Sequence, residues 1–316
     1  MKITKDILRN ITVSCCAMGL MTIVPMSVNA QEEVDTSTSV AEHKAYTGDW
    51  EKFEINDSLL HSFSHSAPNV LVHPELLNDI FEKICQGKRP LRVLHIGDSH
   101  IAGKVLPTTI KAGLCEAFGT AADAYRGGGI YFTYLAKNGA TALNFLIPER
   151  IDAIKESNAD LIIMSFGTNE CHGMGYDEGV HRRQLDKALG TIRELCPKAV
   201  IIMTTPPGDY LAQRSKYYVK NRRTGKKIAK YSSSKKPNPM VKRCAALISS
   251  YADDNGMLVW DLNTMAGGDL SVRNWISKGM MSSDRVHFTP KGYTFQGNLF
   301  VEAFKDAFNR FLDENR

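Results

Sequence analysis

The sequence is poor in cysteine and has no cysteine pattern that would hold a small fold together. Seven cysteines occur among 316 residues, and five of them lie after residue 30. These five are Cys85, Cys115, Cys171, Cys196 and Cys244. An odd number without tight spacing argues against a disulfide framework, and no Cys/His cluster has the spacing of zinc ligands. We expect no structural metal, and we leave open one disulfide if the protein is exported.

The chain also lacks long apolar runs, with one exception near its start. Residues 11–28 are mostly apolar, follow three basic residues and end in small residues at 28–30. This order is typical of a signal peptide that is cleaved after Ala30. A membrane anchor fits less well, because Pro25 and several Ser and Thr interrupt a short stretch. We therefore expect a signal peptide at 1–30, a periplasmic or secreted protein, and no stable membrane span after cleavage.

Internal repeats and low-complexity tracts are absent, and the one glycine run does not fit a nucleotide site. No Lys-Ser/Thr follows Gly127-Gly128-Gly129, and the spacing matches neither a P-loop nor a dinucleotide fingerprint. We interpret this run as a flexible rim of the functional site. Hydrophobic residues make up 43% and charged residues 23% of the chain, as in ordinary globular proteins.

Apolar runs alternate with helical periodicity from residue 73 onwards. The runs at 91–96, 161–166, 199–204 and 257–262 are predicted strands. Predicted helices cover 74–86, 103–118, 148–157, 177–195, 239–254 and 295–312. This alternation predicts an α/β domain over 73–316, with a parallel sheet and helices on both of its faces. Residues 31–72 are interpreted as a polar N-terminal leader that becomes ordered towards Trp50 and Phe53.

Four short motifs occur far apart in the chain, and two of them directly follow predicted strands. They are Gly97-Asp98-Ser99-His100, Asn138-Gly139, Gly167-Thr168-Asn169-Glu170 and Asp284-Arg285-Val286-His287. The carboxyl ends of parallel strands share one edge of the sheet, which is where ligands bind. We therefore expect a serine, an amide donor, a histidine and a carboxylate to meet at that edge.

A serine hydrolase uses these side chains for catalysis. Ser99 would be the nucleophile, His287 the base that takes its proton, and Asp284 the carboxylate that orients the imidazole. The Ser99 amide, the Gly139 amide and the Asn169 side chain would bind the oxyanion. Glycine at 139 would allow the backbone to approach closely. Each motif alone also fits a turn or a helix cap, so it is their joint occurrence that favours catalysis.

At these residues the sequence resembles the SGNH (GDSL-type) esterases over roughly residues 92–311. The family's four blocks match Gly97-Asp98-Ser99, Gly139, Gly167-Thr168-Asn169 and Asp284-Arg285-Val286-His287. The resemblance implies a flavodoxin-like three-layer sandwich with a central parallel sheet. It also implies a triad of Ser99, Asp284 and His287, with no metal and no cofactor.

Further details are similar to the peptidoglycan O-acetylesterase branch of that family, which removes acetyl groups from the muramic acid 6-hydroxyl. They are His100 and the strings at 138–140, 166–170 and 286–293. The chain departs from the branch in one respect. Ser99 and Gly139 are only 40 residues apart, so the carbohydrate-binding-like module that some members carry between these blocks has no room here.

Several functions remain open at this point. The first is an exported carbohydrate O-acetylesterase, with acetylated peptidoglycan as the leading substrate. The second is an esterase or deacetylase for other glycans, or a short-chain lipase. The sequence has no extended apolar lid segment near the four motifs, which argues against long acyl chains. The third is an acetyltransferase or a non-catalytic glycan-binding module on the same fold. A complete set of catalytic residues argues against a binding module but not against a transferase. The oligomeric state is left open.

Residues 208–239 form a basic insertion with ten Lys or Arg and one acid, a net charge of +9. The rest of the chain after residue 30 carries −6. We expect a solvated loop over the catalytic edge, or one that attracts an acidic glycan through Arg222 and Arg223. A nucleic-acid surface is disfavoured in an exported protein. Trp275 is expected either in the core or stacked on a sugar of the substrate.

Overall fold

A computed structural model describes residues 50–315 of the chain, so the predicted signal peptide lies outside the described residues. A five-stranded, wholly parallel sheet forms the centre of the fold, in the order β2-β1-β3-β4-β7. The strands are β1 (Leu91–Gly97), β2 (Ile130–Ala136), β3 (Leu161–Ser165), β4 (Val200–Thr204) and β7 (Leu258–Trp260). This order is that of the flavodoxin-like doubly wound fold.

The central strands are buried on both faces, which explains why they are continuous apolar runs in the sequence. Along β1, Leu91 and Val93 face one core cluster, whereas Leu94 and Ile96 face a second cluster. The register places Gly97 beside Ala136 of β2 and Ser165 of β3. The carboxyl ends of these three strands are therefore level, and the residues that follow them share one edge.

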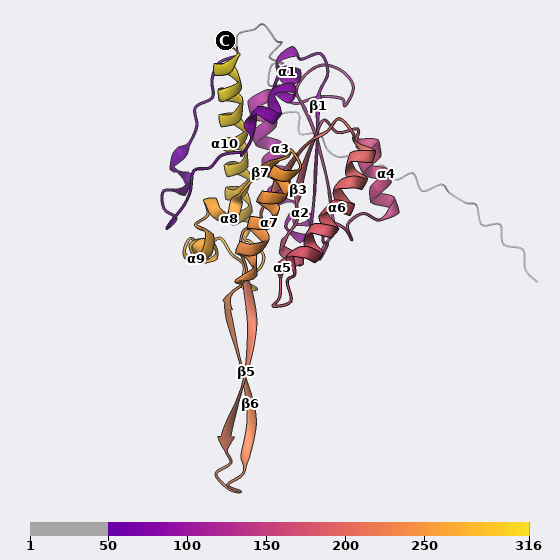
Figure 1. Ribbon diagram of the computed structural model, residues 1–316. Helices are drawn as coiled ribbons and strands as arrows, with labels where there is room; N and C mark the ends of the chain where they lie inside the picture. Colours follow the sequence, from indigo (N-terminus) through magenta and orange to yellow (C-terminus); the bar gives the residue numbers. More distant parts are fainter. Residues whose placement is uncertain (1–49, 316) are drawn as a thin grey trace, which may run out of the picture. The chain divides into compact units, whose positions relative to one another are not determined.

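Helices cover both faces of the sheet (Figure 1). The first core cluster receives side chains from α1 (Asn78–Gln86), α3 (Val105–Phe118) and α10 (Pro290–Glu314). The second receives them from α4 (Pro148–Ser157), α6 (Glu178–Leu195) and α7 (Met240–Asp254). The remaining helices are α2 (Ser99–Ala102), α5 (Thr168–Cys171), α8 (Leu262–Met265) and α9 (Ser271–Ser277), with 3-10 turns at Asp57–Leu60, Pro74–Leu77 and Gly268–Leu270. The predicted three-layer α/β sandwich is confirmed.

Strand β2 was not predicted, and the glycine run before it is not a rim of the site. Ile130 pairs with Leu91 at the amino end of β1, and the Leu91 amide donates to the Gly129 carbonyl at 2.9 Å. A Cβ on Gly128 would lie 3.0 Å from the Gly87 Cα, so close backbone packing requires glycine there. The prediction of a flexible rim is wrong, because Gly127–Gly129 lies at the sheet edge opposite Ser99.

Residues 50–72 belong to the hydrolase fold rather than to a separate leader. Trp50, Leu60, Phe63 and Leu71 are buried in the first core cluster. The Val72 amide donates to the Val259 carbonyl of β7 at 3.0 Å. The boundary that we drew at residue 73 is corrected accordingly. The sequence did not predict that residues 50–72 belong to the fold, because their few buried apolar residues are scattered among polar ones.

The basic insertion is a long β-hairpin rather than a loop. Strands β5 (Tyr210–Lys220) and β6 (Lys227–Pro237) pair in antiparallel register over their full length, and nearly all their side chains are exposed. Figure 1 shows the hairpin leaving the sheet near α9 and α7. The turn is closed by the Asn221 amide, which donates to the Lys226 carbonyl at 2.8 Å, and by Gly225 with φ +70°. Its many lysines concealed the strand pattern.

The five cysteines in the described residues are all buried and all reduced. Two of them lie next to the third motif, where the Cys171 and Cys244 thiols donate to the carbonyls of Thr168 and Gly167 at 3.8 and 3.5 Å. The disulfide that we left open is therefore not formed among them. Within residues 50–315, no helix combines the length and the apolar character that crossing a membrane requires.

Candidate active site

Ser99 lies at a tight turn between β1 and α2. A Cβ on Gly97 would come within 2.8 Å of the Ser165 carbonyl oxygen, so glycine is needed at the end of β1. Asp98 then caps α2, because its Oδ1 accepts from the His100 amide at 2.9 Å. Ser99 is the first helical residue, and amides at that position have no acceptor within the helix.

A chain of hydrogen bonds joins Ser99, His287 and Asp284, as the sequence predicted. Ser99 Oγ lies 2.9 Å from His287 Nε2, and His287 Nδ1 lies 2.7 Å from Asp284 Oδ2. An imidazole held in this way can accept the serine proton through Nε2 while its Nδ1–H donates to the carboxylate. Asp284 and His287 are 49% and 40% exposed, so the site opens to solvent.

The loop that carries Asp284 fixes both carboxylate oxygens. Asp284 Oδ1 accepts from the amides of Val286 and His287, each at 3.0 Å. Burial opposes ionisation of this group, but the bonds from the His287 ring and from these amides outweigh it and lower the pKa of Asp284 to about 2. Arg285 has φ +64°, and the Ser282 amide donates to the His287 carbonyl at 2.8 Å. Asp284 is therefore an anion at every physiological pH.

Asn169 links the loop after β2, which contains Gly139, to Asp98, the residue before Ser99. Asn169, in α5, donates through Nδ2 to the Ala140 carbonyl at 2.9 Å and to Asp98 Oδ2 at 3.1 Å. Gly139 has φ +69°, and a Cβ built on it would meet no described atom within 4 Å. This positive φ favours glycine at position 139.

Two buried carboxyl groups that the sequence did not single out connect the motifs. Glu170 accepts from the Ala142 and Gly167 amides at 2.8 and 2.9 Å, which ties the third motif to the loop after β2. Burial raises the pKa of Asp98 and of Glu170 to about 7 in each case. Their positions beside Ser99 and Asn169 were the only sequence signal for these roles.

His100 is a buried neighbour of the triad rather than a member of it. Its Nδ1 lies 3.0 Å from the Tyr293 hydroxyl and its Nε2 lies 3.3 Å from Thr168 Oγ1. Its ring centroid is 5.4 Å from that of His287. Burial lowers the pKa of His100 to about 4, so its ring is neutral at neutral pH.

The structure corrects the expected substrate contacts. Trp275 is fully buried, its Nε1 donates to the Pro207 carbonyl at 3.0 Å, and its ring packs edge-on against Phe288. It is a core residue and has no free face for a sugar. Arg222 and Arg223 lie in the hairpin turn. An 11-residue strand separates them from the hairpin base, roughly 35 Å at the usual rise per residue. They do not line the active site.

The comparison with protein-family models decides the family. The model of the GDSL-like lipase/acylhydrolase family matches residues 95–295, which hold all four motifs. The chain belongs to this family. No curated protein matches the chain.

One solved structure shows the same fold, and two others resemble the chain more weakly. A peptidoglycan O-acetylesterase structure has a TM-score of 0.60 and 15% identity, and the match covers 76% of this chain and 99% of that one. A lipase/acylhydrolase from Enterococcus faecalis gives a TM-score of 0.45 and 20% identity over 68% of this chain and 96% of that one. The periplasmic domain of a Salmonella ser. Paratyphi A lipopolysaccharide acetyltransferase gives a TM-score of 0.42 and 12% identity. That match covers 71% of this chain and 94% of that one.

Proposed function

We propose that this acylhydrolase is an exported serine esterase that removes acetyl or other short acyl groups from a carbohydrate, with peptidoglycan as the leading substrate. The observation that carries the proposal is the hydrogen-bonded chain from Ser99 through His287 to Asp284 at the carboxyl edge of the sheet. Export rests on the signal-peptide pattern of residues 1–30.

In this proposal Ser99 Oγ attacks the ester carbonyl carbon while its proton passes to His287 Nε2. The Ser99 and Gly139 amides donate to the oxyanion that forms. Asn169 Nδ2 joins them by exchanging one of its two bonds, to Asp98 or to Ala140, for a bond to the oxyanion. His287 then gives the proton to the leaving sugar oxygen, which leaves Ser99 acylated. A water molecule, deprotonated by His287, attacks this ester, releases the acid and restores Ser99.

The exposure of the triad supports a bulky glycan rather than a long acyl chain. His287 and Asp284 are both more than one-third exposed, so a polymer could reach Ser99 without the domain opening. A long acyl chain would instead require an apolar channel to bury it. The strings around His100, Asn169 and His287 support the peptidoglycan assignment, because they resemble the O-acetylesterase branch.

Acetate release from two polymers tests the substrate. O-acetylated peptidoglycan and acetylated xylan are each incubated with the wild-type protein, with and without a free acceptor sugar. We expect faster acetate release from peptidoglycan, with one acetate produced for each ester lost. Faster release from xylan would move the assignment to another glycan. Acetyl transfer to the acceptor in place of free acetate would make the protein a transferase. The Ser99→Ala variant is the blank.

Asn169→Ala tests the proposed oxyanion site. Removal of one oxyanion donor lowers kcat by roughly a hundred- to a thousandfold, and we expect this loss with little change in KM. The matched control is Asn298→Ala, because Asn298 lies exposed on α10. A rise in KM with an unchanged kcat would assign Asn169 to substrate binding. The unfolding temperature of each variant is measured as well. A loss of kcat without a lower unfolding temperature is catalytic, whereas a lower unfolding temperature reports loss of the bonds to Asp98 and Ala140.

A further inference from the structure

The two faces of the β5–β6 hairpin carry different side chains. Residues paired across an antiparallel ladder point to the same side, and successive residues alternate between the sides. We call one side the cationic face. It carries Arg214, Lys216, Tyr218, Lys220, Lys227, Tyr231 and Lys235. The opposite face has Lys230 and Lys236 as its only charges, beside Leu211, Tyr217, Val219 and Ile228.

The charges of the cationic face have no anionic partner among the described residues. Residues 210–237 contain no Asp or Glu, and no ion pair joins the hairpin to the rest of the described chain. Two cations lie over tyrosine rings instead, Arg214 at 4.2 Å from the Tyr231 centroid and Lys216 at 5.2 Å from the Tyr218 centroid. Like charges held along one strand repel each other, and a polyanion would relieve this repulsion.

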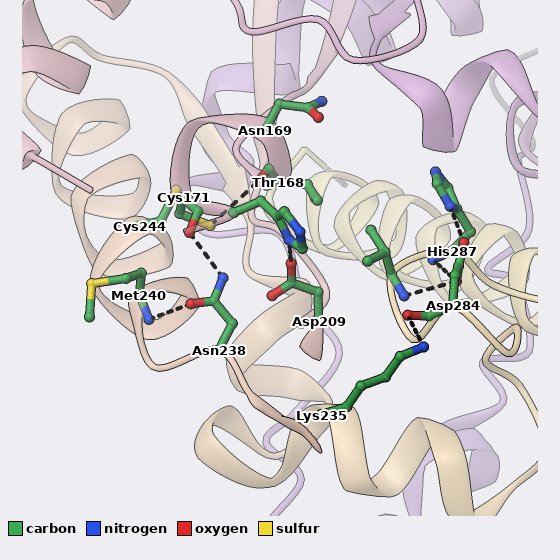
Figure 2. A network of polar contacts seen from close by, with 12 residues as sticks. Thr168, Asn169, Cys171, Asp209, Lys235, Asn238, Met240, Cys244, Asp284 and His287 are labelled. Carbon is green, nitrogen blue, oxygen red and sulfur yellow. Dashed lines mark hydrogen bonds and ion pairs between the residues drawn. The ribbon is translucent and has the colours of Figure 1, made fainter. Parts of the chain in front are cut away.

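The cationic face leads directly to the catalytic loop. Lys235, near the hairpin base, donates through Nζ to the carbonyls of Ser283 and Asp284 at 2.8 and 3.0 Å. Figure 2 shows this lysine reaching the backbone at Asp284, beside His287. On the other strand, the Tyr210 amide donates to the Arg285 carbonyl at 2.9 Å. A polymer lying along this face would therefore end at the triad.

We propose that the cationic face of the hairpin binds an acidic polysaccharide, one with carboxylates along its chain, and guides it to Ser99. Several weak contacts along one strand add up to useful affinity, because each bound carboxylate raises the effective concentration of the next. The exposed tyrosines add ring surfaces for sugar contact. The choice of a glycan over other polyanions rests on the proposed esterase function.

The arrangement of side chains argues against an anionic membrane as the partner of the cationic face. A membrane-binding face needs cations and apolar side chains together. Here the paired Val219 and Ile228 point to the opposite face, away from Lys216 and Lys220. A nucleic acid would satisfy the charges equally well, so it is included as a competing ligand in the test.

Two variants with equal charge changes separate this site from a general charge effect. Lys216→Ser with Lys220→Ser alters the cationic face, and Lys230→Ser with Lys236→Ser removes the same two charges from the opposite face. Binding of fluorescent polygalacturonate, with dextran as the neutral control, is measured by anisotropy at low salt. We expect the first variant to bind roughly tenfold more weakly, as the loss of two exposed ion pairs implies. The second should change Kd by less than about twofold.

This test is independent of the esterase assignment, because polygalacturonate carries no ester to be cleaved. Both variants should hydrolyse a small neutral nitrophenyl ester at the wild-type rate, which shows that they fold. Wild-type binding should also weaken as salt screens the charges over about 8 Å. Equal losses in the two variants, or no loss in either, would overturn the proposal. Tighter binding of single-stranded DNA or of phosphatidylglycerol vesicles with the same face dependence would overturn the choice of a glycan.

Discussion

Ser99→Ala should lower kcat for a nitrophenyl ester by roughly a millionfold, the size of loss seen when a serine hydrolase loses its nucleophile. The hydroxyl lies 2.9 Å from His287 Nε2 and is the only nucleophile in the hydrogen-bonded chain to Asp284. The donors of the oxyanion site bind charge but form no covalent bond to the acyl group. Initial rates at saturating ester, corrected for the uncatalysed reaction, measure the effect.

The unfolding temperature of Ser99→Ala should remain close to that of the wild type, because the substitution removes a single, partly buried hydrogen bond. Ser250→Ala is the matched control, since Ser250 lies exposed on α7 and its hydroxyl donates only to the Leu247 carbonyl. This control should retain full activity. Activity of Ser99→Ala within tenfold of the wild type would end the serine mechanism.

Asp284→Asn should lower kcat by about ten-thousandfold, as the equivalent change does in serine proteases. Asp284 Oδ2 accepts from His287 Nδ1 at 2.7 Å, which leaves Nε2 free to accept the Ser99 proton. An amide can present its NH₂ group to Nδ1 and so favour the wrong tautomer. It also carries no negative charge to stabilise the imidazolium that forms during attack.

The pH profile of the wild type should show no titration of Asp284 between pH 8 and 4. Because the lowered pKa of Asp284 is about 2, this carboxylate remains ionised when the pH falls from 8 to 4. Any activity that is lost between pH 8 and pH 4 therefore does not result from protonation of Asp284. Asp269→Asn is the matched control, because Asp269 is exposed and pairs only with Lys242. A loss of less than tenfold in Asp284→Asn at every pH would remove Asp284 from the triad.

The sequence predicted those parts of the fold that depend on local pattern. Continuous apolar runs gave β1 and β3 almost to the residue, because strands buried on both faces tolerate few polar side chains. The level ends of these strands then brought Ser99 and Asn169 to one edge. The triad geometry followed from the Asp284–His287 spacing, since one tight turn can hold both side chains.

Features that depend on distant contacts were missed. Strand β2 follows a glycine run and has mixed burial, so its only strong signal is its pairing with β1. The burial of Trp275 depends on Phe63 and Phe288, which come from segments far apart in the chain. The carboxyl group of Glu170 acts through amides in another loop. None of these partners can be identified from spacing alone.

Peptide mapping after reaction with a fluorophosphonate tests the central claim most directly. A fluorophosphonate phosphonylates a serine that a neighbouring base has activated, with loss of fluoride, so the label reports the Ser99–His287 pair itself. We predict one adduct per chain, on the peptide that contains Ser99, with labelling lost in the Ser99→Ala variant and strongly slowed in Asp284→Asn. A stoichiometric adduct on any other residue, or no adduct on a folded wild-type protein, would contradict the serine esterase mechanism.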